Sequence, residues 1–312
     1  MHGYQCQAGT GKENNAMKIT SQFIQLFKKV CSHHVMEVLL IVATVIISLA
    51  LVAVAADLKL IDATTLKSDS AKWVILDARP KTDWEAGHIP GAITSSWENY
   101  TRTDAQGIKF SSFSPQELAT ALAILGIDEK TPIVVYGDAD KSWGCEGYNV
   151  WMLSWLGHKG PIRLLNGGIQ AWRNQNFPLV KGPEKPAVKK ALYKVNPTPR
   201  FIISTEEIQK RKGSFVLVDV RSTMERLKGK IPGSIHIPWE DFYTGKEHRP
   251  LSAVELKKLL VSHGVDTSKP VVYYCLGGVR SAYTWMTHQL AGLPDAKNYK
   301  GGWAAWEKQS RP

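Results

Sequence analysis

One cysteine in this chain lies where an enzyme could use it as a nucleophile. Cys275 directly follows the apolar run 271–274 (VVYY), at the carboxyl end of a predicted buried strand. Open parallel sheets place their ligands at this end of their strands. The residues that come next, which we expect to surround a bound substrate, are Leu276, Gly277, Gly278, Val279, Arg280 and Ser281.

The composition of this loop favours an anion or a thiolate. Gly277 and Gly278 permit a tight turn with backbone N–H groups directed inward, and a helix is predicted to begin near Arg280. A helix N-terminus stabilises negative charge by up to about 2 kcal/mol, and a nearby guanidinium adds to the effect. We therefore predict that Cys275 acts as a thiolate on an anionic substrate.

The elements that hold this loop are encoded twice. The segment that begins at Leu76 aligns without a gap to the one that begins at Val218, so that the Asp-x-Arg motif at 77–79 matches the one at 219–221. Pro-Gly pairs, predicted helices and Gly-Gly turns then follow in the same order in both copies. Such extended self-similarity indicates two duplicated domains.

Each copy alternates predicted strands and helices. Apolar runs at 72–76 and 215–218 predict buried strands, and Ser114 and Ser252, each with Glu three residues later, predict capped helices. The predicted fold class is α/β, with two tandem domains that each contain a parallel sheet covered by helices on both faces. The predicted boundaries are 57–180 for the first domain, 181–200 for a Pro- and Lys-rich linker, and 201–312 for the second domain.

An apolar segment precedes the two domains. Residues 38–56 form an uncharged run of 19 residues after Lys28 and Lys29, and the run ends in small residues of the kind that signal peptidase accepts. The run is also long enough to span a bilayer. We therefore expect residues 1–56 to be a signal peptide or a membrane anchor. The two domains are then expected to be periplasmic or otherwise exported, and we expect contact with a membrane only through this segment, if it is not cleaved.

Composition excludes several classes of protein. With 44% hydrophobic and 21% charged residues the chain is globular, and four cysteines in 312 residues are too few for a disulfide scaffold. The net charge of +11 is spread along the chain, which favours anionic small molecules over nucleic acid. Cysteines and carboxylates do not occur at the spacing of metal ligands, so we expect no metal site.

Together these motifs resemble those of the tandem-domain rhodaneses, which are thiosulfate or 3-mercaptopyruvate sulfurtransferases. The resemblance covers essentially all of residues 57–312, and it rests on the Asp-x-Arg motifs, the Cys-x4-Arg loop and Gly-His-Ile-Pro-Gly-Ala at 87–92. In that family the cysteine of the second domain carries sulfur as a persulfide and the first domain is inert, which implies the catalytic role for Cys275. Gly137 takes the corresponding position in the first domain, and Cys145, which matches no catalytic position, is expected to be a packing cysteine.

The resemblance implies a double-displacement sulfurtransferase that needs no cofactor. A small anionic donor such as thiosulfate would pass sulfur to Cys275, and a thiol, cyanide or a protein cysteine would accept it. The loop has neither the thiosulfate nor the mercaptopyruvate pattern of the family, so the donor stays open and polysulfide is a further candidate. Arg226 and Lys230 are candidates for the pocket mouth, whereas Trp239 and Trp303 are expected in the core.

Two other functions compete with this interpretation. An exported carrier could hold persulfide or polysulfide sulfur on the same cysteine without turning it over. A phosphatase or arsenate reductase is disfavoured, because related phosphatases have a Cys-x5-Arg loop that is one residue wider than the loop in this chain.

Overall fold

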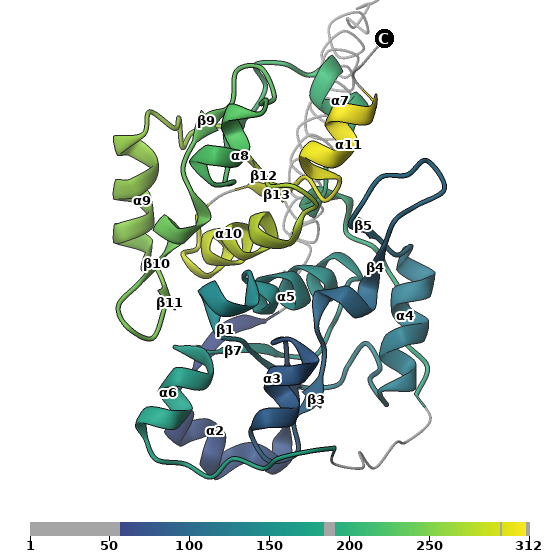
Figure 1. Cartoon of the computed structure of the whole chain (residues 1–312), viewed down its shortest axis with the longest axis vertical. Helices are drawn as coiled ribbons and strands as arrows, with labels where there is room; N and C mark the ends of the chain where they lie inside the picture. The colour runs from purple at the N-terminus through teal and green to yellow at the C-terminus, as the bar shows by residue number, and fades with distance from the viewer. Residues whose placement is uncertain (1–56, 184–190, 294, 310–312) are drawn as a thin grey trace, which may run out of the picture. The chain divides into compact units, whose positions relative to one another are not determined.

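Two parallel β-sheets organise the computed structural model, which describes residues 57–183, 191–293 and 295–309 (Figure 1). The apolar run 38–56, on which the leader prediction depends, lies outside these residues. Within them, no helix combines the length and the apolar character needed to cross a bilayer. The two sheets belong to one compact unit.

The first sheet has the strand order β1-β7-β6-β2-β3, and all neighbouring strands are parallel. Its strands are β1 (Leu58–Ile61), β2 (Val74–Asp77), β3 (Ile93–Thr94), β6 (Ile133–Tyr136) and β7 (Ile162–Leu165). The helices that accompany it are α2 (Ala63–Asp69), α3 (Lys81–Ala86), α4 (Pro115–Ile124), α5 (Cys145–Trp155) and α6 (Gly168–Asn174).

The second sheet repeats this arrangement with the order β13-β12-β8-β9, again all parallel. Its strands are β8 (Val216–Asp219), β9 (Ile235–His236), β12 (Val271–Tyr274) and β13 (Ala296–Asn298). Its helices are α7 (Thr205–Lys210), α8 (Thr223–Leu227), α9 (Ala253–Ser262), α10 (Val279–Leu290) and α11 (Gly302–Gln309). The counterpart of β1 is reduced to a single parallel bridge between Ile202 and Asn298.

Short elements connect these layers. Each domain has a small antiparallel hairpin, formed by β4 (Thr101–Arg102) and β5 (Ser111–Ser112) in the first domain, and by β10 (Tyr243–Thr244) and β11 (Arg249–Pro250) in the second. The 3-10 helices are η1 (Ser70–Lys72), η2 (Trp97–Tyr100), η3 (Ala139–Ser142), η4 (Pro199–Phe201) and η5 (Trp239–Phe242).

Helices cover both faces of each sheet, as the alternation of side chains along the central strands requires. In β12, Val271 and Tyr273 pack into the apolar cluster that contains α9 and α10, whereas Val272 and Tyr274 pack into the cluster that contains α7 and α11. Strand β6 divides its side chains in the same way. The predicted caps are also confirmed, because Ser114 and Ser252 each form a complete capping box.

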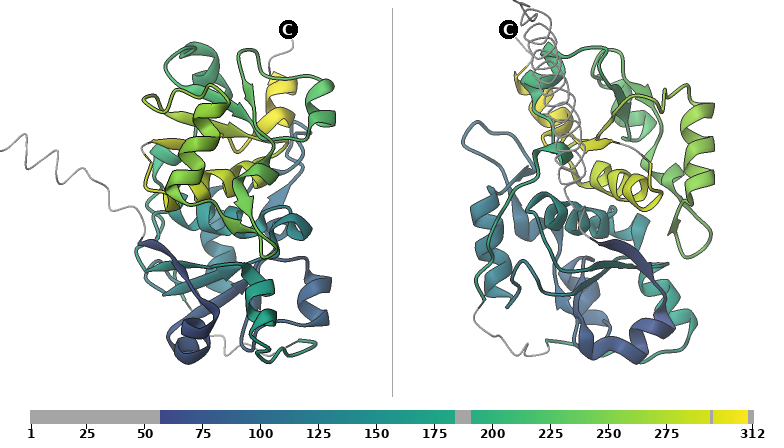
Figure 2. Two further views of the ribbon diagram at one scale, coloured as in Figure 1. Left: turned by 90° about the vertical axis from the view of Figure 1, so that its left-hand side faces the viewer. Right: turned by 180° about the vertical axis from the view of Figure 1, so that it is seen from behind.

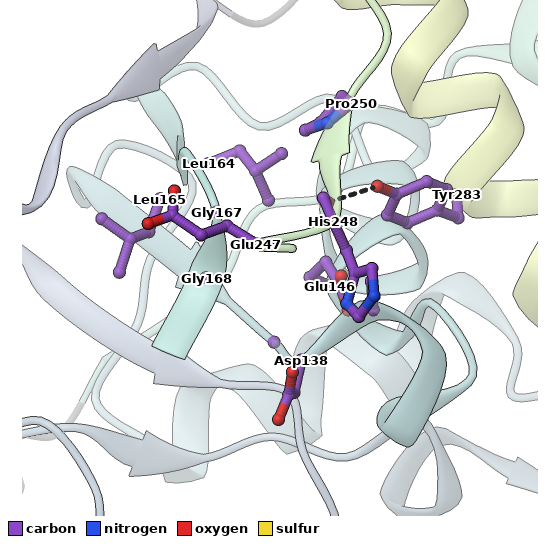
Figure 3. A pocket seen from close by; sticks show the side chains of 12 residues that line it. Asp138, Glu146, Leu164, Leu165, Gly167, Gly168, Glu247, His248, Pro250 and Tyr283 are labelled. Atoms are coloured by element: carbon purple, nitrogen blue, oxygen red, sulfur yellow. Dashed lines mark hydrogen bonds between the residues drawn. The ribbon is translucent and has the colours of Figure 1, made fainter. Parts of the chain in front are cut away.

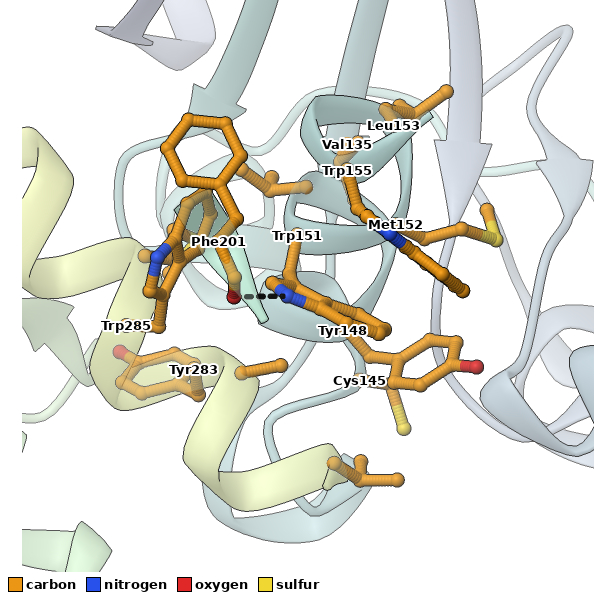
Figure 4. Packing of buried hydrophobic residues seen from close by; sticks show 14 of the residues in the cluster. Val135, Cys145, Tyr148, Trp151, Met152, Leu153, Trp155, Phe201, Tyr283 and Trp285 are labelled. Carbon is orange, nitrogen blue, oxygen red and sulfur yellow. Dashed lines mark hydrogen bonds between the residues drawn. The ribbon is translucent and has the colours of Figure 1, made fainter. Parts of the chain in front are cut away.

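Helices α5 and α10 lie side by side between the two sheets (Figures 1 and 2). Their side chains share one apolar cluster, in which Trp151 and Trp285 are almost wholly buried and the Trp151 indole N–H donates to the Phe201 carbonyl (Figure 4). The helices approach so closely that a Cβ on Gly147 would collide with the backbone of Tyr283. The two domains are therefore packed through a common core.

Candidate active site

Cys275 follows β12 directly and lies at the N-terminus of α10. Gly278, which has a φ of 90°, turns the chain into this helix and donates its backbone N–H to the Cys275 sulfur over 3.1 Å. The Ser281 hydroxyl, one turn into the helix, lies 3.5 Å from the same sulfur. The Gly278 amide and the positive end of a 12-residue helix therefore face the sulfur, an arrangement that stabilises negative charge on it. The single proton of the Ser281 hydroxyl is shared between this sulfur and Asn298 Oδ1, which lies closer, at 2.7 Å.

The loop is fixed by hydrogen bonds from the segment that precedes and begins α11. The backbone N–H of Trp303 donates to the Cys275 carbonyl over 2.8 Å, and the Asn298 side chain donates to the Gly278 carbonyl over 3.0 Å. A Cβ on Gly278 would lie only 2.6 Å from the Lys300 carbonyl oxygen. The position therefore requires glycine, both for its φ and for this close approach.

Arg280 is buried, and its guanidinium donates to both carboxylate oxygens of Glu225 at 2.7 Å each. Burial alone would raise the pKa of Glu225, but the hydrogen bonds and charge of Arg280 lower it to about 2. Burial likewise opposes the charge of Arg280, whereas Glu225 and Cys275 raise the pKa of the guanidinium above its ordinary value. The pair is therefore ionised at neutral pH.

The sulfur lies at a cavity of about 300 Å³ that both domains form. The second domain contributes Glu225, Cys275, Leu276, Gly277, Val279 and Arg280. The first domain contributes three aromatic side chains, Trp97, Phe110 and Trp143, which we call the aromatic wall. This volume is at the lower end of the range for small-molecule sites.

The structure brings most of the predicted substrate residues to this cavity. Leu276, Gly277, Val279 and Arg280 line it, whereas Gly278 and Ser281 lie behind the sulfur as hydrogen-bond donors. Each of the six therefore either lines the cavity or donates a hydrogen bond to the Cys275 sulfur.

The two residues expected at the pocket mouth are not among those that line the cavity. The Arg226 guanidinium turns inward, where it donates to Asp219 Oδ2 over 3.0 Å and to the Ser234 carbonyl over 2.8 Å. The Asp219 carboxylate, which also accepts hydrogen bonds from Arg221 and Tyr274, thus holds Arg226 away from the cavity. Lys230 is exposed to solvent.

The two charged residues of the second Asp-x-Arg motif, Asp219 and Arg221, form an ion pair. The Arg221 guanidinium donates to both Asp219 oxygens, over 2.9 and 2.7 Å, and both side chains are buried. Trp239 is buried in the core as expected, and Trp303 lies under the Arg221 guanidinium, with 4.8 Å from Cζ to the ring centroid. These residues support the sheet edge and do not line the cavity.

The chain matches the model of the rhodanese-like domain over residues 62–175 and again over residues 204–309. The chain belongs to the rhodanese family. The two matched segments coincide with the two sheets and their helices, so each half of the described structure is one rhodanese domain.

Similar proteins include sulfur-handling members of this family. The chain is 31% identical over 246 residues to the sulfur carrier protein TtuD of Thermus thermophilus, covering 72% of this chain and 83% of that protein. It is 30% identical over 260 residues to human 3-mercaptopyruvate sulfurtransferase, covering 78% and 85%. Among solved structures, the rhodanese fold of SseA from Escherichia coli, a 3-mercaptopyruvate sulfurtransferase, matches with a TM-score of 0.68 at 20% identity, covering 80% and 99%. At this identity the last match supports the fold alone.

The first rhodanese domain has an altered version of the same loop (Figure 3). Gly137 follows β6 as Cys275 follows β12, and a Cβ at Gly137 would collide with the carboxylate of Glu146. The side chain of Glu146 is buried, and this burial raises its pKa to about 7. A carboxyl group that is partly protonated at neutral pH therefore fills the space beside this loop.

The cavity at Gly137 measures about 10 Å³, which is room for about one water molecule. Asp138 Oδ1 and His248 Nδ1 are buried at this site without a hydrogen-bond partner. His248 comes from the hairpin of the second rhodanese domain, and its carbonyl accepts from Tyr283 over 3.4 Å (Figure 3). This site has neither a thiol among its lining residues nor the volume to hold a sulfur donor.

Cys145 begins α5 and is a packing residue, as expected. It is 1% exposed, its thiol donates to the Ser142 carbonyl, and it packs in the cluster shared by the two rhodanese domains (Figure 4). Burial raises its pKa well above the ordinary value. Cys145 and Cys275 are both free thiols, and the described residues hold no cluster of three or more metal-ligating side chains.

Four residues of the cavity were not predicted from the sequence, namely Trp97, Phe110, Trp143 and Glu225. Glu225 could have been noticed, because Ser222 and Glu225 have the spacing of a capping box, which the structure contains. The aromatic wall could not have been noticed in the sequence, because its contacts with the catalytic loop cross from one domain to the other.

Proposed function

We propose that this protein moves sulfane sulfur from an anionic donor to a thiophilic acceptor through a persulfide on Cys275. As a rhodanese with relatives named as sulfurtransferases, the chain is a sulfurtransferase. The observation that carries the proposal is the surroundings of the Cys275 sulfur, which accepts from the Gly278 amide and the Ser281 hydroxyl beside a substrate-sized cavity.

In the first step the Cys275 thiolate attacks the outer sulfur of the donor. With thiosulfate, the new bond joins Sγ to that outer sulfur, the sulfur–sulfur bond of the donor breaks, and its electron pair leaves with sulfite. The product is a persulfide anion at the N-terminus of α10. The Gly278 amide and the Ser281 hydroxyl, which already face Sγ, offset its charge.

In the second step an acceptor removes the sulfur. Cyanide or a thiolate attacks the outer persulfide sulfur, and the electron pair of the broken bond returns to Cys275 as a thiolate. The other free thiol of the described residues, Cys145, is buried and donates to Ser142, so it is not available to resolve the persulfide. The described residues therefore offer no internal acceptor, and the acceptor that we propose is an external molecule.

Mass spectrometry of the full-length protein tests this proposal. After incubation with excess thiosulfate, polysulfide or 3-mercaptopyruvate, the peptide that contains Cys275 is expected to gain one sulfur atom. Cyanide should reverse the gain, and Cys275→Ser should abolish it. An unmodified Cys275 with all three donors would refute the proposal.

A carrier function is the second candidate, because one of the similar proteins is named as a sulfur carrier. Multiple-turnover kinetics with small acceptors separate the two functions. Sustained thiocyanate formation from thiosulfate and cyanide supports the enzyme. A single stoichiometric transfer that stops unless a protein partner is added supports the carrier.

We further propose that the two rhodanese domains are exported. The support is the apolar run 38–56 with its basic flank and the small residues at its end. Mass determination of the mature N-terminus after expression in a bacterium tests this: a start near Asp57 in the periplasmic fraction indicates a cleaved signal peptide. An intact chain in the membrane fraction indicates an anchor, and an intact cytoplasmic chain refutes export.

A further inference from the structure

The aromatic wall is built by the domain that has no reactive thiol. The rings of Trp97 and Phe110 lie 5.6 Å apart at an interplanar angle of 60°. Phe110 packs directly on Gly277, where a Cβ would collide with its side chain. Trp143 lies over the Arg280 guanidinium, 5.6 Å from Cζ to the ring centroid, and is 57% exposed. The wall therefore extends from the catalytic loop to the solvent-exposed rim of the cavity.

Two of the three residues of the aromatic wall have a backbone conformation that residues other than glycine rarely adopt. Phe110 has a φ of 62° and Trp143 a φ of 58°, both in the left-handed region. Residues held this way cost free energy, and they occur preferentially at ligand-binding sites. Gly144 follows Trp143 in the same conformation and lies so close to Tyr283 that a Cβ would be 2.8 Å from the Tyr283 side chain. The turn that presents Trp143 is therefore tightly constrained by the neighbouring domain.

The charges at the cavity balance. Arg280 is the single cation among the residues that line it, and both of its terminal nitrogens are bonded to Glu225. A doubly charged inorganic donor would lose its hydration in an aromatic cavity without meeting an unpaired cation, which is costly. A cationic group would gain little as well, since Arg280 already occupies both oxygens of Glu225.

We infer that the cavity selects a sulfur donor that carries an apolar, preferably aromatic, organic group, and that Trp143 determines this selectivity. This inference rests on the proposed function and narrows its substrate class to organic thiosulfonates or persulfides. The organic group packs against the aromatic wall while its terminal sulfur reaches Cys275.

The transfer balances without a further reactant. With a thiosulfonate R–SO2–S⁻, the Cys275 thiolate bonds to the terminal sulfur, and the bond between that sulfur and the sulfonyl sulfur breaks. The sulfinate R–SO2⁻ leaves with the electron pair. Two single negative charges enter the step and two leave it.

The test compares benzenethiosulfonate with methanethiosulfonate on the full-length protein, with cyanide as acceptor and thiocyanate as readout. We expect kcat/KM to be at least tenfold higher for the aromatic donor. Trp143→Ala should lower this ratio about five- to tenfold, mainly by slowing the aromatic donor, and Trp143→Phe should keep most of it. Ile124→Ala, which removes another exposed apolar side chain of the same domain, serves as the matched control and should leave the ratio unchanged.

Comparison of the ratios removes the intrinsic reactivity of the two donors, because it is the same in every variant. A ratio that Trp143→Ala does not change would overturn the inference while Cys275 persulfidation still supported the proposed function. Failure of every donor to modify Cys275 would overturn both.

Discussion

Glu225 accepts a hydrogen bond from Arg280 on each of its carboxylate oxygens, at 2.7 Å, and the same side chain caps the first turn of α8. The sequence separation between the two residues is 55, so the pair ties α8 to the start of the catalytic helix. Arg280 thereby contributes structure and a balanced charge at the cavity, whereas the sequence predicted that its charge would help to stabilise an anion or a thiolate.

Glu225→Gln should leave the positive charge of Arg280 without the carboxylate that balances it. We expect kcat/KM for thiosulfate to rise roughly tenfold, because the guanidinium would then attract the dianion. The free energy of unfolding should fall by about 1–3 kcal/mol, since a partly buried pair is broken. Steady-state kinetics and denaturant unfolding measure the two effects. Glu255→Gln, which weakens the equivalent cap of α9 away from the cavity, is the control. If thiosulfate turnover fell equally in both variants, the charge argument would be wrong.

Ser281→Ala should slow persulfide formation roughly tenfold, because one of the two donors to the sulfur is lost. Single-turnover sulfite release measures this rate. Thr284→Val is the matched variant, since Thr284 is also buried in α10 but donates only to the Ser281 carbonyl. Equal rates in the two variants would show that the Ser281 hydroxyl acts only on stability.

Gly137→Ala should destabilise the protein by about 1–3 kcal/mol, because the added methyl group collides with the Glu146 carboxylate. In the double variant with Glu146→Ala most of this loss should be recovered. Urea unfolding of the two single variants and the double variant gives the coupling energy. Additive losses would show that Glu146 is not the obstacle beside this loop.

Stability should also depend on pH through Glu146. Its pKa is raised by burial to about 7 in the folded protein, so the folded state binds a proton more tightly than the unfolded chain. The contribution is fully present at pH 4 and is lost as the pH rises through about 7, by up to about 3 kcal/mol. Glu146→Gln should remove this loss. Its stability relative to that of the unmodified protein should therefore be higher at pH 8 than at pH 5. Unfolding curves across this range test it against Glu85→Gln, an exposed glutamate. Parallel pH profiles for Glu146→Gln and the unmodified protein would contradict it.

The two described thiols should differ in alkylation. Both cysteines are 1% exposed, but Cys275 lines the cavity, whereas Cys145 packs in the core and its pKa is raised by burial. Iodoacetamide should therefore modify Cys275 much faster than Cys145. Peptide mass mapping over time measures both rates, and denaturation should equalise them. Rapid modification of Cys145 in the folded protein would contradict its role in packing.

The sequence was sufficient for features that depend on local pattern. The strand before Cys275, the glycine turn and the capping boxes at Ser114 and Ser252 follow from residue types at fixed spacing. Contacts between distant segments could not be obtained in this way. Arg226 has the composition of a pocket residue, yet a carboxylate of the sheet, Asp219, binds it on the inner side.

The aromatic wall shows the same limit more clearly. Phe110 directly precedes β5, at the end of the hairpin loop, and has no local signal in the sequence. It reaches the catalytic loop because α5 and α10 pack the two domains through a shared core. Its pairing with Gly277, 167 positions away by the printed numbering, is a property of that packing. No period or spacing encodes it.

The close contact between Phe110 and Gly277 makes the catalytic loop of the second rhodanese domain dependent on the first domain, which has no reactive thiol. After the ancestral gene was duplicated, the copy without a thiol retained a task that selection can act upon. If the aromatic wall selects the donor as we infer, substitutions in it change which molecules reach the sulfur and leave the Gly278 amide that faces the sulfur in place. The preference for a donor can then evolve separately from the reactivity of Cys275. Because both properties depend on contacts between the two domains, the domains act together in one chain.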